Sequence, residues 1–303
     1  MSGSAAGDDF PEATGEAQAP LREPLVLTAD EQRRGMGECA TPDPGRGDYG
    51  DPGTLPGGGH IVIPRSGGHD DSLGFDVVLH FHGFPAMRKS VVRARTGVVL
   101  AGYDWGTGSG AYEARAEPGR MFEALTTDVT RALRAHTGDE RAHVRHLALS
   151  GWSAGYGAVS ALLRKGDSGV DAVVLLDGFH ASYGPGARGD RVDTTAHAAI
   201  VAFAERAAHG EKTFYFTHSA IQTTGYASTT EVAALLASRL GVTLTQAEGT
   251  DDPLGLRAFA DVRGFHLRSF KGDDKRAHCD HLRHATAAIR DVLVPAWQTP
   301  APG

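Results

Sequence analysis

The sequence has little of what marks several large classes of protein. It carries 30 lysine and arginine residues against 37 aspartate and glutamate residues, which gives a formal net charge of −7. This balance predicts no basic surface for nucleic acid. No uninterrupted stretch of about eighteen apolar residues occurs, so the sequence predicts no membrane-spanning helix. RNP-like, P-loop and G-x-G-x-x-G motifs between a strand and a helix are also missing, and no cofactor is expected.

Cysteine is equally scarce, because only Cys39 and Cys279 are present. The two thiols could pair, which would tie the N-terminal part of the chain to the C-terminal part, or both could be free. The sequence does not show the distance that decides between these alternatives. Their spacing does not suit a zinc site built on cysteine. His278, His281 and His284 could not all chelate one ion from a helix, so we expect no metal.

Residues 1–38 are predicted to form a flexible tail. The segment is rich in Gly, Ala, Pro and acidic residues and shows no periodic apolar face. It lacks the apolar region of a signal peptide. The tail would also suit the spacer of an exported protein whose leader has been removed, so localisation stays open with a weak preference for export.

Residues 39–303 are predicted to form one α/β domain. Strand-like apolar runs alternate with helical patterns, which implies right-handed βαβ units and a mainly parallel sheet with helices on both faces. No internal repeat is visible. The predicted strands are 60–64, 75–83, 97–104, 143–151, 170–178, 212–219 and 264–272, and the predicted helices are 118–138, 154–166, 195–210, 228–241 and 280–293.

One serine stands between two glycines where a predicted strand meets a predicted helix. The stretch is GWSAG, residues 151–155, and its serine is Ser153. A tight structural turn would also explain the motif, because G-x-S-x-G is short enough to occur by chance. At a strand-to-helix turn, however, such a serine projects its hydroxyl above the carboxyl edge of the sheet, where open α/β folds bind ligands. The context therefore favours a nucleophile.

GWSAG, in this order of elements, resembles the nucleophile elbow of the α/β-hydrolase superfamily, and the resemblance covers roughly residues 60–295. The stretch HFHGF, residues 80–84, resembles the superfamily loop that helps to hold the oxyanion. The resemblance implies that the oxyanion donors are the N–H groups of Phe84 and Ala154. His82 can equally be an ordinary histidine bonded to backbone.

The resemblance also implies the chain order serine, acid, histidine. A serine hydroxyl is a poor nucleophile without a base, so a histidine is required. His278 is the preferred base, because Asp280 is a plausible helix N-cap and would leave His278 in the preceding loop. His281 would fall in the first helical turn and is the alternative base.

Asp177 is the preferred acid, because it ends the apolar run VVLLD. A carboxylate there is costly to bury without a partner, and a histidine N–H supplies one. The superfamily's commoner acid position follows the next strand, which here ends FYFTHS without an acid. Glu231, Asp251 and Asp252 remain alternatives, although Glu231 is explained more simply as part of a helix cap.

Three loop regions, 102–119, 177–190 and 218–229, are expected to lie over the serine and form an open, partly aromatic cleft. The predicted function is a serine hydrolase that cleaves small-molecule or polymeric carboxylic esters through an acyl-enzyme on Ser153. An amide or peptide hydrolase with the same triad and a non-catalytic binding protein on a hydrolase fold are the alternatives. The sequence does not indicate the oligomeric state.

Overall fold

A computed structural model describes residues 39, 41–185, 191–247, 252 and 254–298. The predicted tail, residues 1–38, lies outside the described residues. A ten-stranded sheet runs through the described chain, and a separate two-stranded ribbon joins β7 (Ser182–Tyr183) to β8 (Val192–Asp193). The strands of the large sheet are β1 (Gly53–Leu55), β2 (Gly59–Val62), β3 (Gly74–Phe81), β4 (Val99–Tyr103), β5 (His143–Trp152), β6 (Ala172–Leu176), β9 (Thr213–His218), β10 (Thr245–Gln246), β11 (Leu256–Val262) and β12 (Phe265–Phe270).

The sheet has the order β1-β2-β4-β3-β5-β6-β9-β12-β11-β10. Strands β4 to β12 in this order pair in parallel, and antiparallel strands extend the sheet at both edges. The chain passes from β3 outward to β4, then returns past β3 to form β5 on its other side. This reversal between β3 and β5 is a topological switch point, where open α/β sheets bind their ligands beyond the carboxyl ends of the strands.

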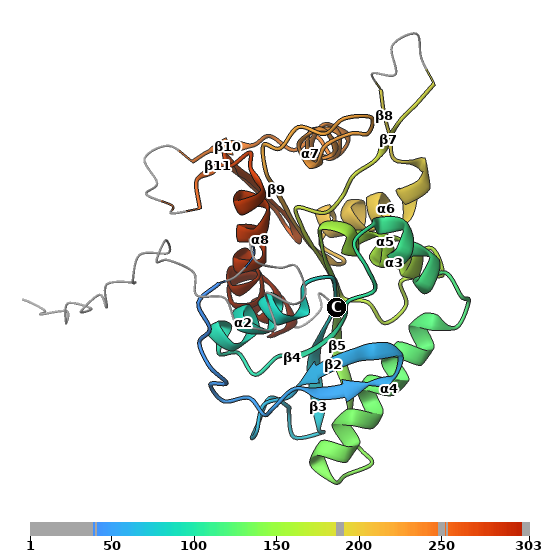
Figure 1. Cartoon of the computed structure of the whole chain (residues 1–303), viewed down its shortest axis with the longest axis vertical. Helices are drawn as coiled ribbons and strands as arrows, with labels where there is room; N and C mark the ends of the chain where they lie inside the picture. The colour runs from blue at the N-terminus through green and yellow to red at the C-terminus, as the bar shows by residue number, and fades with distance from the viewer. Residues whose placement is uncertain (1–38, 40, 186–190, 248–251, 253, 299–303) are drawn as a thin grey trace, which may run out of the picture.

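Helices cover both faces of the sheet (Figure 1). One apolar cluster includes residues of α2, α8 and α9, and a second includes residues of α3 to α7. Strand β3 shows why both faces are covered, because Phe75, Val77 and Leu79 contribute to one cluster and Val78 to the other. The helices are α2 (Phe84–Ala94), α3 (Ser109–Ala116), α4 (Met121–Thr137), α5 (Tyr156–Leu163), α6 (Ala198–Ala208), α7 (Thr229–Arg239), α8 (Lys275–Ala287) and α9 (Val294–Gln298).

The structure confirms the predicted fold class, an α/β fold with a mainly parallel sheet covered by helices on both faces. Helix α4, which lies within the predicted range 118–138, buries Leu125, Val129 and Leu133 at a four-residue spacing, and Gly138 ends it in a left-handed conformation. In the described part of the chain, no helix has both the length and the apolar character needed to cross a membrane.

Two predicted elements were wrong. Residues 102–119 were expected to form a loop, but α3 begins within them at Ser109. The last helix was expected to begin at residue 280, but α8 begins at Lys275. Its N-cap is Asp274, whose carboxylate accepts a hydrogen bond from the N–H of Ala277 at 2.7 Å. Asp280 therefore lies inside the helix, and so does His278.

Buried neutral histidines make the stability of this fold sensitive to acid. His80 on β3 is fully buried, and its Nδ1 and Nε2 lie 2.9 and 2.7 Å from Ser150 Oγ and the His82 carbonyl oxygen. Burial lowers the pKa of His80 to about 3. Among the described residues, burial also lowers the pKa of His82, His180, His197, His218, His281 and His284.

We expect the free energy of unfolding to fall as the pH is lowered from 6.5 to 5, because the unfolded chain then binds protons that the folded chain rejects. A histidine with a pKa as low as that of His80 contributes about 2 kcal/mol over this range. Urea unfolding at several pH values measures the slope. His80→Gln should reduce it, and His136→Gln on the exposed face of α4 should not. An equal slope in wild type and His80→Gln would contradict the assignment.

Candidate functional site

Ser153 occupies a sharp turn between β5 and α5. It opens a short 3-10 turn, Ser153–Gly155, with a φ of +48°. This left-handed value is rare for a residue with a side chain. Ser153 remains partly exposed, although its neighbours Trp152 and Ala154 are buried. The turn therefore presents the hydroxyl-bearing residue at the surface of an otherwise buried segment.

Glycine allows the backbone around Ser153 to pack unusually closely. A Cβ atom at Gly155 would lie 2.0 Å from the carbonyl oxygen of Phe81 on β3. A Cβ atom at Gly178 would lie 2.4 Å from the carbonyl oxygen of Ser153, and one at Gly151 would lie 2.8 Å from the backbone of Gly155. Real side chains do not fit at such distances, so the turn packs directly against its two neighbouring strand ends.

Similar backbone bends end the three neighbouring strands β3, β5 and β6. His82, Ser153 and Asp177 have φ values of +74°, +48° and +43°. Left-handed conformations of residues with side chains cost free energy and concentrate at functional sites. Because the three strands are adjacent in the sheet, the three bends lie side by side at the switch point.

Asp177 lies directly after β6 and is 2% exposed. Its Oδ1 accepts hydrogen bonds from the N–H of Ser219 at 2.8 Å and the hydroxyl of Thr229 at 2.7 Å. Its Oδ2 lies 2.7 Å from Nδ1 of His278. Burial by itself raises the pKa of Asp177. The neighbouring His281 and His278 and the hydrogen bond from Thr229 lower this pKa by a larger amount. The net shift is well below the usual range, so the carboxylate is ionised.

His278 lies in the first turns of α8, and not in a loop as predicted. Since the Asp177 carboxylate can only accept, His278 carries its proton on Nδ1, and the neutral ring has its lone pair on Nε2. The ring packs on Trp152 with a centroid distance of 4.8 Å. Indole Nε1 of Trp152 also donates a hydrogen bond to the His278 carbonyl at 3.0 Å. Trp152 immediately precedes Ser153, so this packing brings His278 to the serine turn.

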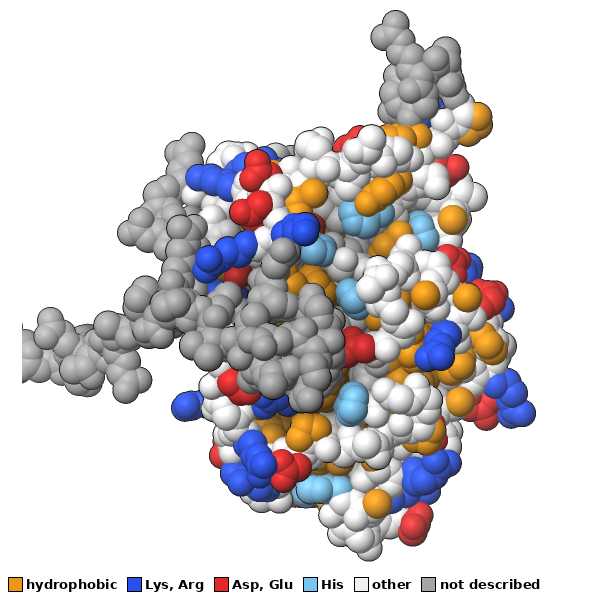
Figure 2. All heavy atoms as spheres, in the orientation of Figure 1, with side chains coloured by type: hydrophobic (Ala, Val, Ile, Leu, Met, Phe, Trp, Pro, Cys, Tyr) orange, Lys and Arg blue, Asp and Glu red, His pale blue; other side chains and the backbone are white. Residues whose placement is uncertain are grey.

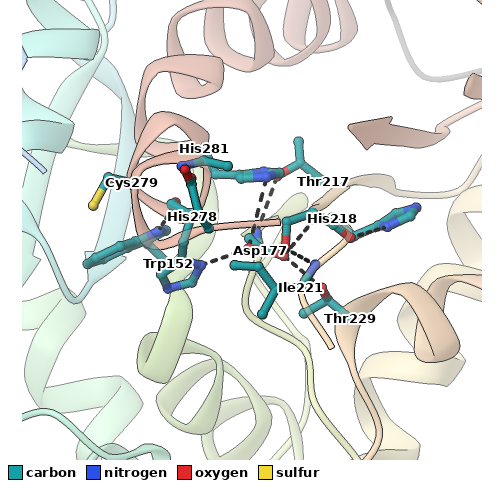
Figure 3. Close-up of polar contacts among 12 residues, drawn as sticks. Trp152, Asp177, Thr217, His218, Ile221, Thr229, His278, Cys279 and His281 are labelled. Atoms are coloured by element: carbon teal, nitrogen blue, oxygen red, sulfur yellow. Dashed lines mark hydrogen bonds and ion pairs between the residues drawn. The ribbon is translucent and has the colours of Figure 1, made fainter. Parts of the chain in front are cut away.

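His281, the alternative base, is placed behind the carboxylate (Figure 3). It is 1% exposed, its Nδ1 lies 2.7 Å from the Thr217 hydroxyl, and its Nε2 lies 3.9 Å from Asp177 Oδ2. Burial lowers its pKa to about 4. The His278 side chain is 24% exposed. His278 is therefore the accessible one of the two histidines, and His281 lies buried beside Asp177.

Among the described residues, the Ser153 hydroxyl makes no hydrogen bond to His278 or to any other group. The structure therefore holds the acid–histidine pair together and leaves the serine hydroxyl unpaired. Hydrogen bonds between nucleophile and base are often long before substrate binds.

The two predicted oxyanion donors each follow one of the strained bends. Ala154 follows Ser153 in the serine turn, and Phe84 begins α2 directly after Gly83. The Asp104 carboxylate accepts a hydrogen bond from the N–H of Gly83 at 2.6 Å and lies 3.5 Å from the N–H of Phe84. The strong bond holds the loop through Gly83, and the Phe84 N–H is bonded only weakly.

The other acid candidates have different roles or positions. Glu231 forms a capping box with Ser228 at the start of α7, as the sequence predicted. Asp252 accepts a hydrogen bond from the N–H of Leu254. Asp251 lies outside the described residues.

Sequence reasoning missed several residues that support this site. Trp152 is one of them, because its ring lies between those of His82 and His278 and stacks on His82 at a centroid distance of 4.9 Å. The position of Trp152 inside GWSAG, directly before Ser153, is the sequence feature that could have indicated this role. Thr229 donates to Asp177 and lies 52 residues from it in the sequence, and Asp104, which accepts from Gly83, lies 73 residues from Asp177. The sequence around neither residue indicates this supporting role.

Cys39 and Cys279 form a disulfide, which settles the alternatives left open by the sequence. Cys279 follows His278, and its side chain points away from Asp177 (Figure 3). The disulfide therefore fastens the start of α8 on the side opposite the carboxylate.

A cavity of about 360 Å³ opens beside Ser153 and Ala154. The loop before α3, the segment after β6 and the segment before α7 contribute to its walls, as the sequence predicted for the loops above the serine. A larger cavity of about 840 Å³ lies against α4 and contains none of the groups described above. Across the described ranges, no group of three or more His, Cys, Asp or Glu is arranged to hold a metal ion.

No protein-family model matches the chain, and no curated protein matches it in sequence. Among solved structures, it is similar to a cold-adapted esterase from an Arctic intertidal metagenomic library, with 13% identity, coverage of 85% of this chain and 98% of that one, and a TM-score of 0.43. It is similar to an acetyl xylan esterase from Aspergillus awamori, with 13% identity, coverage of 73% and 90%, and a TM-score of 0.41. Est1E from Butyrivibrio proteoclasticus gives 11% identity, coverage of 80% and 94%, and a TM-score of 0.41.

Gly155→Ala should destabilise the protein by about 3 kcal/mol or more, because the new methyl group meets the Phe81 carbonyl. Chemical unfolding measures the change. Gly110→Ala is the matched control, since a Cβ atom there meets nothing within 4 Å and alanine suits the first turn of α3. Equal stability of the two variants would show that the serine turn is not tightly packed against β3.

Removal of the disulfide by the double substitution Cys39→Ser and Cys279→Ser should lower the free energy of unfolding by about 2–5 kcal/mol, because the link closes a long loop. Thermal unfolding with and without a reductant checks this. Reduction should shift the wild type toward the double variant and leave the variant itself unchanged. A wild type that is insensitive to full reduction would contradict the expected contribution.

Proposed function

We propose that this protein is a serine hydrolase that cleaves carboxylic esters, with Ser153 as nucleophile, His278 as base and Asp177 as the acid that orients it. The observation that carries the proposal is the convergence at the switch point. A strained serine and a buried ionised aspartate end adjacent strands, and one histidine contacts both the aspartate and the residue before the serine. The strained backbone of the serine and the burial of a charged carboxylate both cost free energy, and a turn with a structural role alone requires neither.

The proposed reaction begins when Nε2 of His278 takes the proton of Ser153 as Oγ attacks the acyl carbon. Asp177 accepts the hydrogen bond from Nδ1, so it fixes the tautomer that leaves Nε2 free and stabilises the cation that forms. The histidine then gives the proton to the leaving alcohol. Water then gives a proton to the same nitrogen as its oxygen attacks the acyl carbon. The bond from the acyl carbon to Ser153 Oγ breaks, the histidine returns the proton to Oγ, and the carboxylic acid is released.

Negative charge develops on the carbonyl oxygen in both steps. We assign its stabilisation to the N–H groups of Ala154 and Phe84, which follow two of the strained bends. The Asp104 carboxylate fixes the loop through its short bond from Gly83, and the substrate oxygen would replace its longer, weaker bond from the Phe84 N–H.

We also propose that the protein works in an oxidising compartment, which agrees with the export weakly favoured from the sequence. The support is the disulfide between Cys39 and Cys279, since such bonds persist mainly outside reducing cytoplasm.

A fluorophosphonate probe should label Ser153 in the wild type, and mass spectrometry of the labelled peptide identifies the site. Ser153→Ala should remove labelling and lower kcat for ester hydrolysis by at least about 10⁴-fold. Asp177→Asn should lower kcat by about 10⁴-fold, because it favours the wrong tautomer of His278. His136→Gln, far from the site on α4, is the control and should react like wild type.

Equal labelling of wild type and Ser153→Ala would end the proposal, and absence of labelling in both would favour a binding protein on this fold. A panel of matched esters and peptides, assayed with the same preparations, separates ester cleavage from amide cleavage. Faster cleavage of the peptides would replace the ester assignment and keep the triad.

A further inference from the structure

The cavity beside Ser153 is lined by hydroxyl groups. Thr107 and Ser109 lie before and at the start of α3, Tyr156 begins α5, Ser182 lies in β7, and Tyr226 precedes α7. Alanine supplies the only aliphatic side chains of this lining. A long acyl chain would gain little from such walls, because apolar burial is what binds it.

The same lining is electrically neutral. No lysine, arginine, aspartate or glutamate belongs to it, and its two histidines, His180 and His197, lose protonation because burial lowers the pKa of each. A charged substrate group would therefore lose its hydration without gaining a partner of opposite charge. The cavity selects against ions and against long hydrocarbon chains.

His180 presents a hydrogen-bond acceptor. Its Nδ1 lies 3.2 Å from the carbonyl oxygen of Ala227, which can only accept, so Nδ1 carries the proton. Nε2 of the neutral ring then has a lone pair, and no described residue donates to it. An acceptor of this kind pairs with a hydroxyl group of a ligand.

Tyr226 supplies an apolar surface next to that acceptor. It is 45% exposed, an unusual value for a large aromatic residue in this chain, and its ring stands edge to face against His180 at 5.1 Å. Histidine side chains are visible at several places along the middle of the face in Figure 2. An aromatic face beside hydroxyls and an imidazole suits a ring that is apolar on its faces and hydroxylated at its edge.

We propose that this cavity binds a neutral polyhydroxylated ring, such as a sugar, as the alcohol part of the ester substrate. A neutral ring that carries hydroxyl groups enters an ester through one of those hydroxyls, so the ring belongs to the alcohol part of the substrate. His180 and Tyr226 are the residues assigned to recognise it. This inference rests on the proposed ester hydrolase function, since it names the substrate class of that same site.

The experiment compares two acetate esters of similar size, an O-acetylated methyl xyloside and cyclohexyl acetate, which lacks the ring hydroxyls. The wild type should show a kcat/KM for the xyloside ester at least about tenfold higher, because the polar groups of the cavity stay unpaired when cyclohexyl acetate binds. His180→Phe and Tyr226→Ala should each reduce this ratio. Val262→Ala, which alters the other exposed large hydrophobic side chain on β11, should leave the ratio unchanged.

Binding of the alcohol alone provides a second readout that needs no catalysis. Methyl xyloside should bind to Ser153→Ala protein in a calorimetric titration, more tightly than cyclohexanol and more weakly after Tyr226→Ala. If the wild type reacts with the fluorophosphonate probe at Ser153, equal kcat/KM values of the unlabelled wild type for the two esters, or equal binding of the two alcohols to Ser153→Ala protein, would overturn the inference alone. Loss of labelling would instead overturn the proposed function.

Discussion

A single buried carboxylate joins four parts of this molecule. Asp177 follows β6, accepts from Ser219 after β9 and from Thr229 at the start of α7, and pairs with His278 on α8. Unpaired, an ionised group that is 2% exposed would cost several kcal/mol. Its three donors therefore act together, and each one fixes the position of a segment that is distant in sequence.

Packing within the sheet holds the strained backbone bends around the site in place. Nε2 of His80, inside the sheet, lies 2.7 Å from the carbonyl oxygen of His82, the bent residue that ends β3. Gly155 and Gly178 let the serine turn touch both neighbouring strand ends. Bends that would be unfavourable alone are held because the surrounding backbone leaves no room for relaxation.

Local sequence patterns predicted the fold class, the strand-to-helix turn at Ser153 and the pairing of Asp177 with His278. The apolar run of β6 directly indicates a buried strand. The glycines around Ser153 directly indicate a close approach of neighbouring backbone. The start of α8 was missed because Asp274 and Asp280 are both competent N-caps, and only the packing of the helix selects the first. Helix α3 was hidden by the glycines before and within it.

Contacts between distant residues could not be read from local patterns. The pairing of Cys39 with Cys279 spans 240 residues, and the support of Gly83 by Asp104 depends on the adjacency of β3 and β4. In both cases the contact forms because the order of the strands in the sheet brings the two residues close together.

That pairing has a consequence for biosynthesis. The ribosome delivers Cys39 long before Cys279, so these two thiols can pair only after all the strands of the sheet have been synthesised. His278, the last residue of the proposed triad, is synthesised one residue before the second thiol. Closure of the disulfide and completion of the proposed site therefore become possible at nearly the same moment, and a nascent polypeptide that stalls earlier has neither.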